Sequence, residues 1–115
     1  MTTPFESLAG LDRLVHEPAR MAILTALAAC KSADFLFLQN LTGLTKGNLS
    51  THLTRLEEGK LIEVVKEIVG KKMVTRIVLT EPGRAAINQH WQRLQELRDQ
   101  AEQWQAEEPP PDETA

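Results

Sequence analysis

Two amphipathic segments joined by a glycine-bearing turn constrain the fold of this chain more than any other feature of its sequence. Asp34 is suited to cap a short helix over residues 35–41, and Thr42-Gly43 marks its end. Thr45 is suited to cap a second, longer helix that Gly59 ends. Leucines recur in it at spacings of four and three, which places them on one stripe: Leu49, Leu53 and Leu56. A short helix, a tight turn and a longer helix form the helix-turn-helix pattern.

Helical periodicity also precedes this motif. Leu8, Leu11, Leu14 and Val15 recur at helical spacing and predict a first helix. This helix must end before Pro18, because a proline pushes the residue before it out of the α region. Pro18 itself suits the first turn of a second helix. We therefore expect two helices ahead of the helix-turn-helix.

After Gly59 the pattern changes to β-branched residues. Residues 61–69 and 73–79 are two such runs around Gly70-Lys71-Lys72, which predicts a β-hairpin. Thr80 can then cap a last helix, whose apolar residues recur every three or four positions as far as Trp104. The predicted fold is mainly α with a small β-hairpin: a winged helix-turn-helix with an extended C-terminal dimerisation helix.

Composition excludes several classes of protein. The 115 residues are 42% hydrophobic and 25% charged, which fits one globular domain over residues 1–105. Residues 106–115 carry three prolines and four acidic residues, so we expect a disordered acidic tail there. The lone Cys30 and three scattered histidines indicate no metal site, no cofactor and no catalytic grouping, hence no enzyme. No apolar run reaches the roughly 20 residues that cross a membrane, and no export signal is present, which favours a cytoplasmic protein.

The sequence also resembles a known family in three places. Residues 42–58 (TGLTKGNLSTHLTRLEE) resemble the recognition segment of small winged-helix transcriptional regulators related to the MarR and ArsR families. Residues 17–27 (EPARMAILTAL) are similar to the second helix of that group, and residues 79–84 (LTEPGR) to its exit from the wing. The resemblance covers about residues 8–97. It implies a DNA-binding regulator that dimerises through its terminal helices.

Three departures from the family pattern stand out. The family places a glycine directly before the residue that opens the strand, whereas Gly59 stands one place early and Lys60 takes that slot. Either the helix ends sooner, or Lys60 is left-handed at a cost of roughly 1 kcal/mol. Val74 stands where the family has an arginine in the wing, which weakens the expected contact with the DNA backbone. Cys30 stands alone, so the paired cysteines of metal-sensing relatives are absent.

Charge and residue type point to the surface that would meet DNA. The chain has a net charge of −3, yet residues 46–84 carry 8 basic and 5 acidic residues. Opposite the leucine stripe of the predicted recognition helix, residues 45–58, lie side chains that can bond base edges or thymine methyl groups. The helix residues predicted to bind DNA are Thr45, Lys46, Asn48, Ser50, Thr51 and Arg55. The alternative is an ordinary solvated helix face, with Arg55 paired to Glu58.

The hairpin tip, residues 69–73, is the predicted wing. Lys71, Lys72 and Arg76 are its candidates for phosphate or minor-groove contact. Lysines on an exposed hairpin also discourage pairing with other strands, which is the alternative role. Arg76 has a further alternative, an ion pair with Glu63 or Glu67 across the hairpin.

The last helix carries more apolar residues than a small winged core can cover. Residues 97–104 lie two or more turns beyond the wing, with nothing in the same chain expected to meet them, so a partner helix is the simplest cover. Burying a tryptophan is worth on the order of 2–3 kcal/mol. The predicted dimer interface comprises Leu8, Leu11, Trp91, Leu94, Leu97 and Trp104.

These inferences combine into one functional hypothesis. We expect a homodimeric, sequence-specific transcriptional regulator of double-stranded DNA, with the recognition helix in the major groove and the wing on the backbone. The sequence indicates no particular small-molecule effector. The alternative is a protein-binding winged-helix module without DNA affinity, which the net acidity of the chain would suit.

Overall fold

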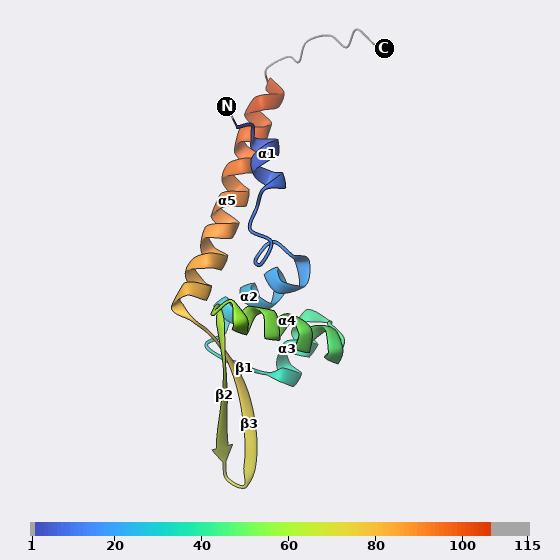
Figure 1. Cartoon of the computed structure of the whole chain (residues 1–115), viewed down its shortest axis with the longest axis vertical. Helices are drawn as coiled ribbons and strands as arrows, with labels where there is room; N and C mark the ends of the chain where they lie inside the picture. The colour runs from blue at the N-terminus through green and yellow to red at the C-terminus, as the bar shows by residue number, and fades with distance from the viewer. Residues whose placement is uncertain (1, 107–115) are drawn as a thin grey trace. The chain divides into compact units, whose positions relative to one another are not determined.

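The computed structural model describes residues 2–106. Its elements follow the order α1 (Pro4–Ala9), α2 (Pro18–Ala29), β1 (Ala33–Asp34), α3 (Phe35–Thr42), α4 (Lys46–Glu58), β2 (Ile62–Val69), β3 (Lys72–Leu79) and α5 (Glu81–Ala106) (Figure 1). The predicted winged helix-turn-helix with a long C-terminal helix is thus confirmed. Within the described range, no helix combines the length and apolar character needed to span a bilayer. The predicted acidic tail lies outside the described residues from position 107 onward.

The chain forms two compact units. Asp12–His90 make up the winged unit, and the segments up to Leu11 and from Trp91 onward make up the helical unit. The winged unit holds α2 to α4, the three strands and the first turns of α5. The helical unit holds α1 and the remaining turns of α5.

The sheet of the winged unit has the strand order β1-β3-β2, and both pairs of neighbours are antiparallel. In the hairpin, Ile62 pairs with Leu79 and Val69 with Lys72, so the connecting loop is only Gly70 and Lys71. Gly70 has a φ of 65°, which a glycine adopts without strain and which suits a two-residue hairpin loop. The two-residue strand β1, which pairs with β3, was not predicted because so short a segment has no periodicity.

A single apolar core holds the winged unit together. The predicted leucine stripe of α4 is fully or almost fully buried and packs with residues from α2, α3, the strands and the start of α5. The largest side chains without exposed surface in this core are Ile23, Leu24, Leu27, Leu38, Leu49, Leu56, Ile62, Ile77 and Ile87. The burial of the stripe turns the opposite face of α4 toward solvent.

The predicted first helix is wrong beyond residue 9. The Gly10 N–H donates to the carbonyls of Glu6 and Ser7 and ends α1. The Asp12 carboxylate then accepts from the Leu14 N–H at 2.9 Å, an aspartate turn that competes with helix formation. Val15 is nevertheless buried in the core of the winged unit. Of the four apolar residues that predicted the helix, Val15 is buried, Leu11 and Leu14 are half-buried and Leu8 is exposed, so their spacing did not reflect one continuous helix.

At the end of α4, the structure shows which of the two alternatives for Gly59 and Lys60 holds. Lys60 is left-handed, with a φ of 61°, and its N–H donates to the Glu57 carbonyl while the Leu61 N–H donates to that of Leu56. This is a Schellman motif with a lysine in the position that glycine favours. Gly59 serves another purpose, since a Cβ there would lie 2.5 Å from Leu14 Cδ2. The helix ends early, and Lys60 is left-handed as well.

Thr80 begins α5, as predicted. Its hydroxyl accepts from the Gly83 N–H at 2.9 Å and donates to the Lys60 carbonyl at 2.8 Å, which ties the start of α5 to the end of α4. Gly83 is required at this crossing because a Cβ would lie 1.9 Å from the Leu61 carbonyl oxygen. The connections on both sides of the hairpin are therefore fixed to each other.

In the helical unit, α1 covers part of α5. The rings of Phe5 and Trp104 meet edge to face, with centroids 6.0 Å apart, and Leu97 is fully buried. This corrects the expectation that nothing in the same chain was left to meet the end of α5. The sequence prediction failed here because it extended the first helix through residues 11–15 instead of confining it to residues 4–9.

Candidate nucleic-acid interface

The N-terminus of α4 is open to solvent. Thr45 caps it by accepting a hydrogen bond from the Asn48 N–H at 3.2 Å, as predicted. Lys46 is exposed in the first turn, and apart from its chain neighbours and the backbone of its own helix, no described atom lies within 4 Å of where a Gly47 Cβ would stand. The free N–H groups of such a turn favour an anion. This end of α4 has the geometry and the charge to receive a phosphate.

The face of α4 opposite the leucines is polar and exposed. It carries Asn48, Thr51, Thr54 and Arg55, and the exposed Ser50 lies on its flank. The hydroxyls of Thr51 and Thr54 each donate at 3.0 Å to the backbone carbonyl four residues earlier. A shallow hollow on this face is lined by Thr51, Thr54, Arg55 and Glu58. Neighbouring residues on one exposed helix face therefore combine a guanidinium, methyl groups and an amide.

Arg55 is not tied to its neighbours. Among the described residues, neither Glu58 nor another carboxylate forms an ion pair with its guanidinium. The alternative in which Arg55 pairs with Glu58 therefore does not describe this structure. All five guanidinium N–H groups of Arg55 remain available to a base edge or a phosphate.

One flank of α4 is fixed by a polar network that sequence reasoning missed. Arg20, whose side chain is only 13% exposed, donates from Nη1 to His52 Nδ1 at 3.1 Å and from Nε to the Leu14 carbonyl at 2.7 Å. Because arginine can only donate, Nδ1 of His52 carries the lone pair. Glu17 lies 3.5 Å from the same nitrogen and caps α2. His52 thus holds α4 against the start of α2 instead of facing outward.

The charge of Glu17 is stabilised within this network. Burial by itself raises the pKa of Glu17, but the N–H donors of Arg20 and Ala19 and the charge of the Arg20 guanidinium outweigh it, so the pKa lies below its usual value. The carboxylate therefore stays ionised while it caps α2. The only sequence signal for this network was a glutamate directly before Pro18, in a cap position that Ser, Thr, Asp or Asn usually fill.

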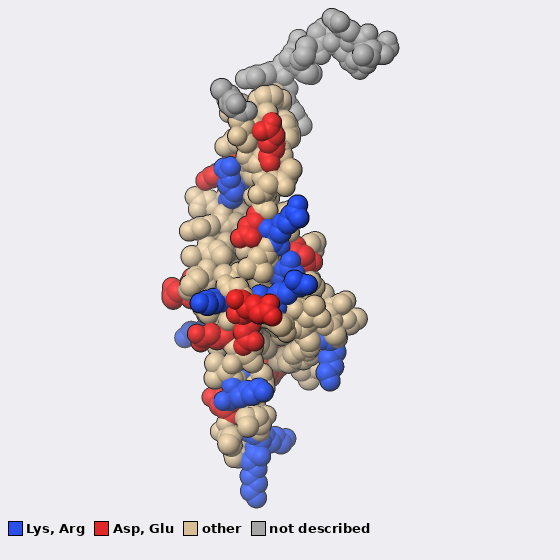
Figure 2. Space-filling view, in the orientation of Figure 1, with Lys and Arg blue, Asp and Glu red and all other residues tan. Residues whose placement is uncertain are grey.

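The predicted wing is a real hairpin with a basic tip. Lys71 and Lys72 are exposed at its end, where Figure 2 shows Lys and Arg side chains. Arg76 forms an ion pair with Glu67 on the neighbouring strand, one of the two alternatives raised by the sequence. Exposed apolar residues accompany the lysines, since Ile68 and Met73 face each other and are 74% and 63% exposed. At the tip of the hairpin, residues 69–73, the positive charge thus comes from Lys71 and Lys72.

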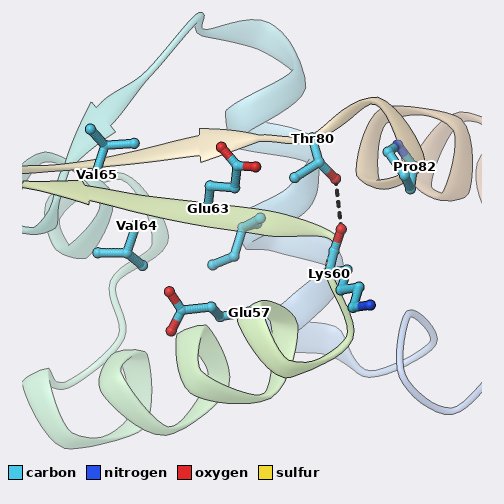
Figure 3. Close-up of a pocket in the computed structure, with 8 residues that line it drawn as sticks. Glu57, Lys60, Glu63, Val64, Val65, Thr80 and Pro82 are labelled. Carbon is cyan, nitrogen blue, oxygen red and sulfur yellow. Dashed lines mark hydrogen bonds between the residues drawn. The ribbon is translucent and has the colours of Figure 1, made fainter.

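A groove lined by two carboxylates and by Lys60 lies at the C-terminal end of α4. This groove of about 480 Å³ lies where the end of α4, β2 and the start of α5 meet (Figure 3), and the carboxylates of Glu57 and Glu63 line it. Val64, Val65 and Pro82 supply its apolar walls. Carboxylates repel phosphates, so the part of α4 suited to DNA is its N-terminal half and the middle, up to Arg55.

The predicted dimer residues differ in exposure. Trp91 and Trp104 are 47% and 46% exposed, and Leu8 also presents surface. Leu11 and Leu94 are half-buried. Leu97 is fully buried within its own chain, so it offers no surface to a partner in this structure.

Comparison with known proteins agrees with this geometry. The family model described as "Winged helix DNA-binding domain" matches residues 19–98. An uncharacterized protein of Methanocaldococcus jannaschii is 29% identical over 85 residues, which make up 74% of this chain and 92% of that protein.

Solved structures show the same fold. A transcriptional regulator homologue from Pyrococcus horikoshii OT3 superposes with a TM-score of 0.75 at 23% identity, over 84% of this chain and 94% of that one. A mutant of MarR from E. coli gives a TM-score of 0.64 at 22% identity, over 80% of this chain and 64% of that one. The fold is that of MarR-type transcriptional regulators, and because the family model covers most of its length, this chain belongs to the winged helix DNA-binding domain family.

Proposed function

We propose that this protein is a sequence-specific transcriptional regulator that binds double-stranded DNA as a homodimer. The observation that carries this proposal is the exposed face of α4, where Asn48, Thr51 and Arg55 stand outward on a helix fixed by a buried leucine stripe and by the Arg20–His52 bond. Asparagine, threonine and arginine are the residue types that bond adenine, contact thymine and bond guanine in the major groove. The basic N-terminus of α4 supports the same role.

In this proposal α4 enters the major groove and the wing, residues 69–73, lies on the backbone. Thr45, Lys46 and Ser50 contact phosphates near the helix start, and Lys71 and Lys72 contact phosphates at the hairpin tip. Arg76 takes a smaller share, because Glu67 already compensates its charge. In a dimer, two such helices would enter successive major grooves about 34 Å apart on a near-palindromic site.

The homodimer rests on the apolar surface of the helical unit. Phe5, Leu8 and Trp104 present exposed apolar area on α1 and α5, and Trp91 adds more at the start of this unit. The rings of Phe5 and Trp104 meet and form one apolar patch, and exposed apolar patches mark interaction sites. A second copy of the same surface is the partner that a two-fold symmetric regulator supplies.

A salt titration tests DNA binding. Fluorescence anisotropy with random duplex DNA should give an affinity that falls steeply with salt. Lys71→Ala and Lys72→Ala should each reduce the slope of log affinity against log salt by about one unit. Arg98→Ala removes the same charge from an exposed position on α5 and should leave the slope unchanged. A wild-type protein that binds no duplex at low salt would refute the proposal.

The second candidate is a protein-binding winged-helix module without DNA affinity. Exposed apolar residues on α3 favour it, since Leu36, Phe37 and Leu41 are 64%, 45% and 53% exposed. Helix α3 lies beside α4 in the helix-turn-helix, so a protein bound there would cover part of the proposed DNA surface. In the same titration, absence of DNA binding at low salt would favour this candidate.

A further inference from the structure

The hydroxyls of the two threonines on the exposed face of α4 both donate to the helix backbone. Thr51 Oγ1 donates to the Gly47 carbonyl and Thr54 Oγ1 donates to the Ser50 carbonyl, each at 3.0 Å. A hydroxyl has a single hydrogen, so neither side chain has a donor left for a base. Both side chains are nevertheless exposed. To a base in the major groove, each threonine therefore offers a methyl group and the remaining lone pairs of Oγ1, which is bonded to the helix backbone.

Because both hydroxyl hydrogens are used by the helix backbone, only some base edges can be favoured by the threonines. A donor would be needed to bond the acceptors of guanine or the N7 of adenine, and that donor is occupied. The amino groups of adenine and cytosine could still donate to Oγ1, and replacement of thymine by deoxyuridine distinguishes such a bond from a methyl contact. Thymine alone presents a methyl group in the major groove. When the threonine methyl group meets the thymine methyl group, both lose contact with water. The threonine Oγ1 keeps its hydrogen bond to the helix backbone and needs no new partner.

We propose that Thr51 and Thr54 read thymine through its C5 methyl group, so that the bound sequence carries thymines opposite these two residues. This inference rests on the proposed function, since it names the base that the same helix face selects. The two residues are three positions apart and their Cα atoms therefore differ by about 4.5 Å along the helix axis. Bases along one strand rise by about 3.4 Å. Residues this close on one helix reach neighbouring bases, so the two thymines should lie within two base pairs of each other.

The neighbours of the threonines sharpen this assignment. Thr51, Thr54 and Arg55 line one hollow together with Glu58. The unpaired guanidinium of Arg55 is suited to the O6 and N7 acceptors of guanine. The selected site should thus contain a guanine next to the thymines.

Replacement of thymine by deoxyuridine tests the proposal, because it removes only the C5 methyl group. The probe is a fluorescein-labelled duplex obtained by selection from a random pool, with each thymine replaced in turn. For the wild-type protein, two positions in each half-site should be sensitive. A single replacement at either of them should weaken binding about fourfold, the effect of one buried methyl group. Replacement of thymines outside the protected region is the control and should change nothing.

Variants of Thr51 separate the methyl group from the hydroxyl. Thr51→Val keeps a methyl group and should retain the preference for thymine over deoxyuridine. Thr51→Ser keeps the hydroxyl but loses the methyl group. It should no longer distinguish thymine from deoxyuridine at the base opposite Thr51, while the preference at the base opposite Thr54 persists. Thr54→Val and Thr54→Ser should show the same behaviour at the second position. Because both residues are exposed, circular dichroism should show unchanged folding for all four proteins.

The outcomes distinguish this inference from the proposed function. Absence of duplex binding at low salt would refute both. Binding that is salt-sensitive and selective but indifferent to deoxyuridine would refute only the reading of thymine. A serine variant that keeps the preference while the valine variant loses it would also overturn the inference, because the hydroxyl would then be the reading group.

Discussion

Nδ1 of His16 and Nε2 of His90 lie 3.0 Å apart and share a hydrogen bond within the winged unit. His90 is only 6% exposed, and the two ring centroids are 5.1 Å apart. Such a bond needs a donor and an acceptor, so at least one imidazole must be neutral. The bond joins the loop before α2 to α5 in a position where a second proton is unfavourable.

The protonation of His90 should therefore make the stability of the protein depend on pH. Burial lowers the pKa of His90, the charge of His16 lowers it further, and Asp12 acts in the opposite direction. A histidine in the unfolded chain titrates near 6.5. Below that pH the unfolded chain binds more protons than the folded one, so the free energy of unfolding falls as the pH falls.

The first prediction compares the wild type with His90→Gln between about pH 7.5 and about pH 5.5, around the ordinary histidine pKa. The variant should be less stable at the higher pH, and the difference in unfolding free energy should shrink as the pH falls. Urea denaturation at several pH values measures it. Asn88→Gln, an exposed change on the same helix, should follow the wild type. A difference that stays constant across this range would contradict the prediction.

The second prediction concerns the left-handed lysine that ends α4. Lys60→Gly removes the clash that a Cβ suffers at a φ of 61° and should raise the free energy of unfolding by about 1 kcal/mol. Lys60→Ala removes the charge but keeps the Cβ, so it should bring no such gain. Chemical denaturation of the three proteins gives the comparison, and equal gains for glycine and alanine would show that the charge, not the backbone, matters.

The neighbouring glycine should behave in the opposite way. Gly59→Ala would bring a Cβ to 2.5 Å from Leu14 Cδ2, so this partly buried side chain, which packs against the core, must move. We expect a loss of about 1–3 kcal/mol from this overpacking. The same denaturation experiment measures it. A Gly59→Ala protein as stable as the wild type would mean that the loop carrying Leu14 yields freely.

Comparison of sequence and structure explains which features were predictable. The starts of α3 and α4 were, because Asp34 and Thr45 cap them through local hydrogen bonds. The leucine stripe was as well, since its periodicity directly reflects burial. The double role of Gly59 and Lys60 could not be resolved, because it depends on Leu14, a residue distant in sequence.

The same distinction applies to the candidate site. The outward face of α4 follows from helical periodicity. The Glu17–Arg20–His52 network does not, since it joins residues up to 35 positions apart through specific geometry. The extent of the first helix was misjudged because Asp12 forms a turn that apolar spacing does not reveal.

The fourth prediction concerns Arg55 in the proposed DNA interface. Its guanidinium has no ion pair within the described residues, so Arg55→Ala should leave stability nearly unchanged. Loss of a bidentate contact with guanine should weaken binding to the selected duplex by roughly 1–3 kcal/mol and relax specificity at one base pair. Anisotropy titrations with selected and random duplexes measure both effects. Full affinity and selectivity in the variant would exclude this role for Arg55.

The last prediction concerns the proposed dimer. Removal of the residues after Arg93 deletes most of the part of α5 that belongs to the helical unit, including Trp104 and the buried Leu97. The truncated protein should be monomeric. In the full chain, Trp104→Ala should weaken association because it removes exposed apolar area and the edge-to-face contact with Phe5. Gln103→Ala changes an adjacent exposed side chain of the same helix and should leave association intact. Sedimentation velocity over a range of concentrations distinguishes these cases, and a truncated protein that still sediments as a dimer would place the interface on the winged unit instead.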